Sequence, residues 1–195
     1  MRKPYLYNGL AVFVLLLVVA GAFRLGTEVK PKDGEQDFDT ETLSIKEALF
    51  AYFLNDGTEL NDPMVYRGAG GLNPFRFSNL ADEGTLVFRF SGEGCGICVE
   101  SVVDQIRSVF PDFEHNDRIV LLGSQIVERA KIRYYGKPII SFVDQELNLP
   151  IEPLRMPYFF VVNKAMLATL FFIPDPDHPY LTDLYLKTVS DRFGF

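Results

Sequence analysis

Short apolar runs, each bounded by polar or turn-forming residues, recur along the second half of the chain. Runs of this length are typical of strands buried inside a sheet. We predict five strands or extended segments: Thr85 to Ser91, Arg118 to Gly123, Ile139 to Val143, Tyr158 to Val162 and Met166 to Ile173. Only Asn163-Lys164-Ala165 separates the last two, which predicts a hairpin.

Between these runs, apolar residues recur at the spacing of a helix. This pattern predicts a helix from Gly96 to Phe110, with Pro111 following it. A second helix is predicted from Val127 to Tyr135, where Gly136 ends it. A last helix follows Pro179, and its apolar face is predicted to be Leu181, Leu184, Tyr185 and Val189.

The order of these elements indicates the fold class. Strand and helix alternate in the first half of the domain, which implies parallel strands joined by crossovers. The later hairpin adds antiparallel pairing. We therefore predict an α/β fold with a mixed central sheet and helices on both faces.

The first 23 residues have the features of a targeting segment. Arg2 and Lys3 precede the apolar run Gly9 to Phe23, which suits a secretory signal and, extended back to Pro4, is long enough to cross a membrane. Ala20-Gly21-Ala22 is a candidate cleavage site. We expect residues 1–23 to be a signal anchor, which we favour, or a cleaved signal peptide. The basic residues place the following domain on the exported side.

The polar stretch 24–43 is predicted to be a linker. Residues 44–74 form an N-terminal extension with a short helix from Ser44 to Leu54, and the segment from Asp62 to Leu80 is predicted to be rich in loops. Residues 75–195 form the main domain.

Charge excludes one class of partner. The chain of 195 residues has a net charge of −7 and no basic stripe that could release counterions from phosphates. A nucleic-acid partner is therefore not expected.

The only two cysteines, Cys95 and Cys98, are separated by Gly96 and Ile97. They stand where a predicted helix begins, and the partial positive charge of a helix N-terminus stabilises a thiolate. A structural disulfide between them closes a very small loop, and the stabilisation from loop closure grows with loop length. We interpret the pair as redox-active, with an idle local disulfide and metal binding as the alternatives.

This arrangement resembles the thioredoxin fold, and the exported setting resembles the bacterial TlpA/ResA-type thiol–disulfide oxidoreductases. Two motifs carry the resemblance: the segment from Phe90 to Cys98 that follows a buried strand, and Arg155-Met156-Pro157-Tyr158-Phe159 at the start of the hairpin. It covers about residues 75–195. The resemblance implies a three-layer fold in which the proline is cis and packs against the cysteine pair.

The resemblance also implies roles for individual residues. Cys95 is the attacking thiolate and Cys98 is the resolving thiol. Gly96 and Ile97 tune the potential and contact the substrate. Met156 and Pro157 line the groove that receives a substrate peptide, with the backbone of Met156 offering hydrogen bonds.

The chain departs from the family pattern at three positions. Gly94 stands where the family usually has Trp, and Ile97 stands where many members have Pro. Arg89 stands six residues before Cys95, where thioredoxins carry a buried acid. Arg89 is predicted either to point toward the cysteines, which would lower a thiol pKa, or to face solvent.

Other titratable groups near the motif are predicted to be surface groups. The nearest carboxylates, Glu93 and Glu100, are expected to be solvated, and the only histidines, His115 and His178, to lie in exposed loops. Metal sites usually need three or four ligands. No metal and no cofactor is therefore predicted.

Together these features predict an exported thiol–disulfide oxidoreductase held by a single-pass segment in the inner (cytoplasmic) membrane, with its domain on the periplasmic side. Its partners would be the thiols and disulfides of exported proteins and a membrane redox partner. The alternatives are a thioredoxin-fold binding or scaffold module with an inactive disulfide, and a metal-handling thioredoxin-like protein.

Overall fold

The computed structural model describes residues 49, 52–67, 73–91, 96–124, 133–142 and 147–195. The chain divides into two compact units, Met1–Thr42 and Leu43–Phe195, and every described residue belongs to the second. The predicted targeting segment and linker lie outside the described residues, as do Glu93, Gly94 and Cys95.

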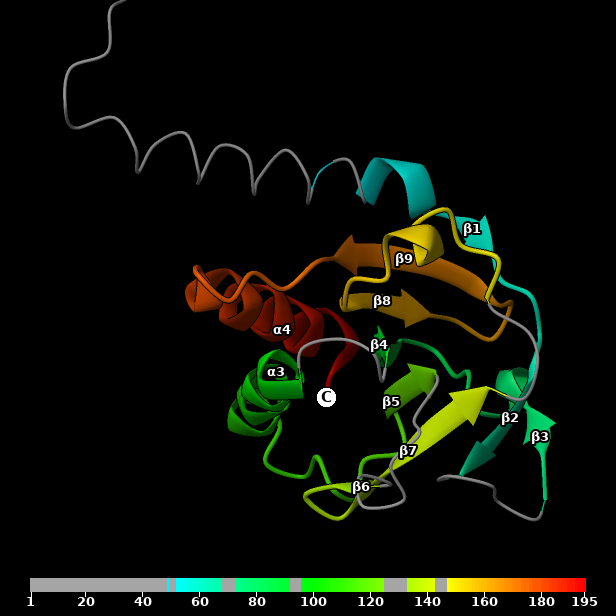
Figure 1. Ribbon diagram of the computed structural model, residues 1–195, viewed down its shortest axis with the longest axis horizontal. Coiled ribbons are helices and arrows are strands. Elements are labelled where there is room, and N and C mark those ends of the chain that lie inside the picture. Colours follow the sequence, from blue (N-terminus) through cyan, green and yellow to red (C-terminus); the bar gives the residue numbers. More distant parts are fainter. Residues whose placement is uncertain (1–48, 50–51, 68–72, 92–95, 125–132, 143–146) are drawn as a thin grey trace, which may run out of the picture. The chain divides into compact units, whose positions relative to one another are not determined.

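The described residues form one mixed sheet, shown in Figure 1. Its strand order is β1-β9-β8-β4-β5-β7-β2-β3, with β6 paired to β7. The central strands are β4 (Thr85–Ser91), β5 (Ile119–Ser124), β7 (Lys137–Phe142), β8 (Tyr158–Val162) and β9 (Leu167–Phe172). The shorter strands are β1 (Thr58–Glu59), β2 (Met64–Arg67), β3 (Phe75–Arg76) and β6 (Arg133–Tyr134). Strands β4, β5 and β7 are parallel, and β8 and β9 continue the sheet as an antiparallel hairpin.

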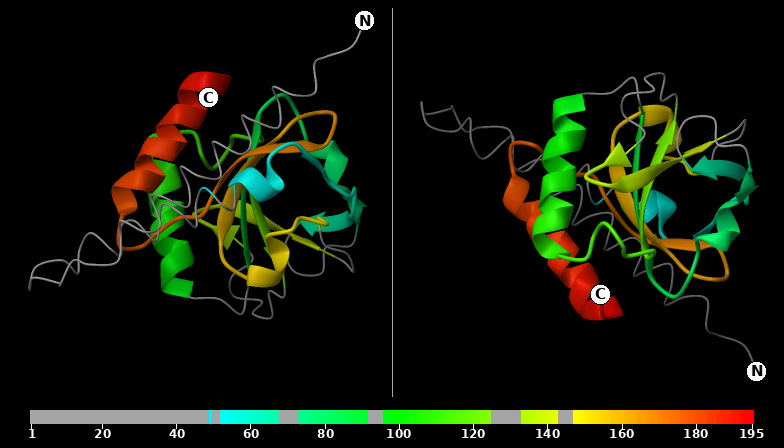
Figure 2. Two further views of the ribbon diagram at one scale, coloured as in Figure 1. Left: turned by 90° about the horizontal axis from the view of Figure 1, so that it is seen from above. Right: turned by 90° about the horizontal axis from the view of Figure 1, so that it is seen from below.

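Two helices cover one face of the sheet. Helices α3 (Gly96–Val109) and α4 (Pro179–Phe193) lie side by side against it in all views (Figures 1 and 2). The strands supply alternate residues to this face, as their pleat requires. The resulting apolar cluster includes Leu86, Phe88 and Phe90 from β4, Val99, Val103 and Ile106 from α3, and Leu186 and Val189 from α4.

The opposite face is covered by shorter segments. Its apolar cluster combines strand residues such as Val87 and Phe160 with Phe77, Leu149 and Ile151. Phe77 begins the 3₁₀ turn η1 (Phe77–Asn79), and Ile151 precedes the 3₁₀ turn η3 (Glu152–Leu154). Strand β4 is therefore buried on both faces. The described residues confirm the predicted α/β fold with a mixed central sheet. Helices were predicted on both faces, but α3 and α4 lie on the same face, and the other face carries the 3₁₀ turns η1 and η3.

The segment from Asp62 to Leu80 was predicted to be rich in loops, but it contains β2, β3 and η1. Strand β2 pairs antiparallel with β7 and with β3, so β3 is the edge strand and β2 lies next to it. Val65 is the only fully buried residue of β2. A strand with one buried residue has too little alternation to be recognised from sequence.

The helix predicted from Val127 to Tyr135 is wrong at its end. Arg133–Tyr134 is the strand β6, which pairs with β7 across a turn at Tyr135 and Gly136. These two residues have φ values of 45° and 84°, and positive φ at both central positions is what a type I′ hairpin needs. Residues 127–132 lie outside the described residues.

The buried face of α4 also differs from the prediction. Thr182, Leu186 and Val189 are buried, whereas Leu184 is 62% exposed. Both sets of residues recur at helical spacing, so periodicity alone could not separate them. Packing against the sheet determines that the face with Thr182, Leu186 and Val189 is buried.

Candidate active site

Cys98 lies in the first turn of α3, the helix that follows β4 in the chain. Helix α3 begins at Gly96, so the backbone of Gly96 and Ile97 forms the start of the helix, where its partial positive charge is concentrated. Cys98 is half-buried and disulfide-bonded, so it is not a free thiol. Its neighbour Val99 is buried in the core, and this contact fixes how the first turn sits on the sheet.

Ile97 is the most exposed large apolar side chain near this turn. It is 81% exposed, although apolar side chains of this size are usually buried. The predicted contact between Ile97 and a substrate is therefore sterically open. The partner cysteine, Cys95, lies outside the described residues.

Met156 and Pro157 connect η3 to β8. Met156 is 41% exposed, and Pro157 is half-buried. The expectation that Pro157 is cis is wrong, because the described residues contain no cis peptide bond. The trans form is the lower in energy for most X–Pro bonds, and here the chain reverses direction at Arg155, whose φ is 53°.

Arg89 does not face solvent, which was one of the two orientations predicted for it. Its position relative to Cys95 lies outside the described residues. Its side chain is 6% exposed and forms a buried ion pair with Glu152, with 3.0 Å between Arg89 Nη2 and Glu152 Oε2. Arg89 Nε also donates to Glu152 Oε1 at 3.3 Å. Arg89 Nη1 donates to the carbonyl of Phe90 at 2.5 Å and to Ser124 Oγ at 3.1 Å.

Glu152 is a residue of this site that sequence reasoning did not identify. It lies 63 positions after Arg89, and its side chain is also 6% exposed. Tyr158, the first residue of β8, donates its hydroxyl hydrogen to Glu152 Oε1. The sequence feature that pointed to such a residue was Arg89 itself, because a charged side chain in a buried strand needs a partner of opposite charge that is also buried.

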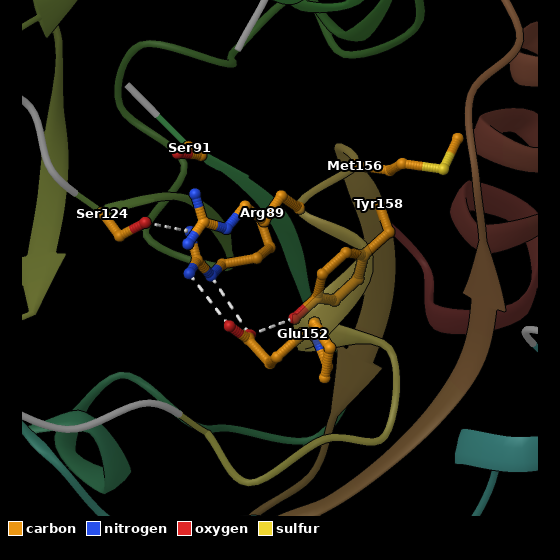
Figure 3. Close-up of a pocket in the computed structure, with 8 residues that line it drawn as sticks. Arg89, Ser91, Ser124, Glu152, Met156 and Tyr158 are labelled. Carbon is orange, nitrogen blue, oxygen red and sulfur yellow. Dashed lines mark hydrogen bonds and ion pairs between the residues drawn. The ribbon is translucent and has the colours of Figure 1, made fainter. Parts of the chain in front are cut away.

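These residues surround a pocket of about 180 Å³, drawn in Figure 3. Its lining residues are Arg89, Ser91, Ser124, Glu152, Pro153, Arg155, Met156 and Tyr158. Ser91 and Ser124 are the last residues of β4 and β5 and stand opposite each other in register. Ligand sites in open α/β sheets lie at the carboxyl ends of the strands, and this pocket occupies that place.

The structure brings some of the predicted site residues to this pocket and not others. Met156 lines it, next to the end of the strand that leads to the cysteine motif. Gly96, Ile97, Cys98 and Pro157 do not line it. The pocket is therefore a neighbour of the predicted exchange site on the side of Met156.

Of the other titratable groups predicted to be exposed, one is exposed and two are half-buried. His115 is exposed, whereas His178 is half-buried and lies 2.9 Å from Asp175 Oδ2 through its Nδ1. Glu100 is half-buried. Within the described part of the chain, no group of three or more His, Cys, Asp or Glu residues could hold a metal ion.

None of the helices that the structure describes is both long and apolar enough to span a membrane. The apolar run Gly9 to Phe23, on which the predicted anchor depends, is not among the described residues.

Comparison with known proteins gives similarity in structure only. No family model matches the chain, and no curated protein matches it. Similar solved structures include the exposed lipoprotein thioredoxin of Streptococcus pneumoniae, with a TM-score of 0.47, 13% identity, and coverage of 67% of this chain and 99% of that chain. The copper-bound ScoI of Arabidopsis thaliana gives a TM-score of 0.45, 13% identity, and coverage of 69% and 99%. The thiol peroxidase of Chromobacterium violaceum gives 0.44, 10% identity, and coverage of 71% and 87%. At these values the similarities do not distinguish one activity from another.

Proposed function

We propose that this protein is a thiol–disulfide oxidoreductase that exchanges disulfides with protein substrates through Cys95 and Cys98. One observation carries the proposal: Cys98 lies in the first turn of α3, the helix that follows the central strand β4 in the chain. A cysteine pair at a helix N-terminus has a stabilised thiolate. Only the thiolate is the nucleophile in disulfide exchange.

The exchange runs in two steps. The Cys95 thiolate attacks one sulfur of a substrate disulfide, forms a bond to it, and releases the other substrate sulfur as a thiolate. The Cys98 thiolate then attacks the Cys95 sulfur, which forms the Cys95–Cys98 disulfide and releases the remaining substrate sulfur as a thiolate. The substrate gains two electrons and the protein loses two. The reverse sequence oxidises a substrate dithiol.

The surroundings suit an extended peptide as substrate. Ile97 and Met156 are exposed apolar side chains, 81% and 41% exposed respectively, on the two segments that flank the site. The backbone of Met156, just before β8, would offer strand-like hydrogen bonds to the peptide. Specificity would then come from contacts of the peptide's side chains with Ile97 and Met156.

The proposal includes a location and partners. Residues 1–23 would hold the domain at the exported side of the inner membrane, where protein disulfides form and persist. The substrates would be exported proteins, and a membrane redox partner would return Cys95 and Cys98 to their starting state.

The second candidate is a binding or scaffold module whose disulfide is idle. The observation that favours it is Arg89, which stands where thioredoxins carry a buried acid. The carboxylate that Arg89 binds, Glu152, is also bound by Tyr158, so it is not free to take part in proton transfer. A module of this kind would use the same exposed surface without exchanging electrons.

Trapping in cells separates the two candidates. In the full-length protein, Cys98→Ala should leave Cys95 linked to its substrates, because the second attack cannot occur. These adducts should appear on non-reducing gels and vanish on reduction. The matched control is Cys95→Ala, which should trap few partners because Cys98 lies further along the helix. If Cys98→Ala gives no adducts under any growth condition, the oxidoreductase proposal is wrong and the idle module stands.

A further inference from the structure

The buried ion pair at the site joins segments that are distant in the sequence. Arg89 lies in β4, and its guanidinium contacts Glu152 of η3 and Ser124 at the end of β5. It also lies over the ring of Phe142 at the end of β7, with 5.1 Å between Cζ and the ring centroid. Glu152 in turn accepts a hydrogen bond from Tyr158 of β8. One cluster of side chains therefore connects four strands to the segment that carries Met156 and Pro157.

The Arg89–Glu152 ion pair is buried, which limits what it can contribute to stability. Both side chains of the Arg89–Glu152 pair are 6% exposed. Moving two charges out of water is costly, and a buried ion pair is often no more stabilising than apolar residues of the same volume. The pair has bidentate geometry, which fixes orientation as well as distance. Its evident effect is to hold the connected segments in one arrangement.

The polar groups of the cluster satisfy one another, which argues against a tight ligand site at this point. Glu152 Oε1 accepts from Arg89 Nε and Tyr158, and Glu152 Oε2 accepts from Arg89 Nη2. Arg89 Nη1 is used by Phe90 and Ser124. A ligand in the pocket would have to compete with these bonds.

The cluster is also linked, through Phe90, to the apolar cluster that contains the neighbour of Cys98. Arg89 donates to the carbonyl of Phe90, and the Phe90 side chain belongs to the same apolar cluster as Val99, the neighbour of Cys98. On its other side, Glu152 lies four residues before Met156. Both flanks of the proposed exchange site are therefore attached to the same ion pair.

We propose that Glu152 and Tyr158 are positioning residues for the cysteine pair, acting through Arg89 to hold the Met156–Pro157 segment against the end of β4. This inference rests on the proposed function for its biological meaning. No proton or electron passes through Glu152 in it. The network sets the distance between the segment that receives the substrate and the turn that carries Cys98.

A position held in this way affects the two redox forms differently. A network that fits the first turn of α3 better in one redox form than in the other shifts the equilibrium between the disulfide and the dithiol. A residue that only stabilises the fold lowers or raises both forms together and leaves that equilibrium unchanged. The reduction potential therefore separates the two roles.

The test compares Tyr158→Phe and Glu152→Gln with the unchanged full-length protein, both with the cysteines intact. Tyr158→Phe removes one hydroxyl and keeps the ring contacts with Phe160 and Phe171. We measure the equilibrium with glutathione buffers and the rate of reaction of the reduced protein with a small disulfide. We expect Tyr158→Phe to change the equilibrium constant about threefold, or ~14 mV for a two-electron couple. Glu152→Gln should slow exchange about tenfold, as small misplacements near a reacting group do.

Lys137→Met is the matched control. Lys137 is also a buried cation, but it lies at the opposite end of the sheet, where β7 begins. This variant should leave the potential and the exchange rate unchanged, whatever it does to stability. If Glu152→Gln does not fold, Tyr158→Phe still gives the answer.

The outcomes also separate this inference from the proposed function. An unchanged potential and rate in Tyr158→Phe overturn the positioning role, as does an equal shift in Lys137→Met. If the unchanged protein fails to trap protein substrates but Tyr158→Phe still shifts the potential, the oxidoreductase proposal fails and the positioning role survives.

Discussion

The two ends of the parallel strands each bury one cation, and they compensate its charge in different ways. At the carboxyl end, Arg89 is paired with the carboxylate of Glu152. At the amino end, Lys137 Nζ donates to the backbone carbonyls of Phe113 and Asn116 at 3.0 and 2.7 Å. The residue as a whole is 5% exposed in both cases.

The difference has a consequence for charge. A carbonyl carries only a partial negative charge, so the lysine keeps part of the penalty for leaving water. Burial accordingly lowers the pKa of Lys137 to about 8. Arg89, by contrast, faces a carboxylate side chain instead of backbone carbonyls.

The comparison explains why the two ends suit different tasks. The Arg89–Glu152 end has a fixed charge pattern and a fixed bidentate geometry, which suits a site that must keep its shape. The Lys137 end holds together the connection between α3 and β5 and changes its charge in mildly alkaline solution. The proposed exchange site lies at the first of these two ends.

The largest expected effect comes from removing one member of the buried pair. Arg89→Met leaves the Glu152 carboxylate buried without its cation, so we expect the free energy of unfolding to fall by about 3–5 kcal/mol. Urea denaturation at pH 7 measures this loss. The double variant Arg89→Met, Glu152→Met should recover most of it, because no charge is then left unpaired.

A small loss in the single variant, comparable to that of an exposed pair, would contradict this account. A double variant no more stable than Arg89→Met would show that the two side chains contribute separately. Either result would remove the basis for contrasting the two ends of the sheet.

The sequence predicted the strands β4 and β8 to the residue, because continuous apolar runs buried on both faces leave a strong signal. It also located the turn of α3 that carries Cys98, since the helix has a regular apolar face. It missed β6, whose two residues are defined by a tight turn and by pairing with β7. Short edge elements depend on their neighbours, and periodicity within them has no room to develop.

The site was predicted only in part for a related reason. Arg89 was recognised as unusual, but its partner could not be named, because Glu152 is close to it only after the chain has folded. Likewise, nothing in the sequence marks Lys137 as buried, since its two acceptors are backbone atoms. Contacts between segments that are far apart in the sequence cannot be predicted from the local pattern of residues.

The second expected effect is a dependence on pH at the Lys137 end. The pKa of Lys137 is lowered in the fold, from 10.5 to about 8, so between these values the unfolded chain binds more protons than the folded one. Stability therefore rises with pH across this window. One proton can contribute at most about 1.4 kcal/mol per pH unit. Below pH 8 the lysine is charged in both states and the slope from this group vanishes.

Urea denaturation of the unchanged protein and of Lys137→Met at pH 7.5 and at pH 9.5 isolates the contribution of this lysine. The difference in stability between the two proteins should shift in favour of the unchanged protein as the pH rises, and other titrating groups cancel in that difference. A difference that stays constant between the two pH values would mean that Lys137 is no less charged in the fold than in water, and the contrast with Arg89 would be lost.

The smallest expected effect concerns an ion pair that is not buried. Lys164 Nζ lies 2.9 Å from Asp82 Oδ1, closer than the Arg89–Glu152 contact, but the two side chains are 66% and 53% exposed. The hydrogen bond between them lowers the pKa of Asp82 and raises the pKa of Lys164. Water and salt screen such a pair, and ordering two long side chains costs entropy.

We expect the urea midpoint of Lys164→Met to equal that of the unchanged protein within error, at low and at high salt. A clear loss of stability that disappears at high salt would show that exposure does not decide the strength of ion pairs in this fold, and the burial of Arg89 and Glu152 would then not explain their effect.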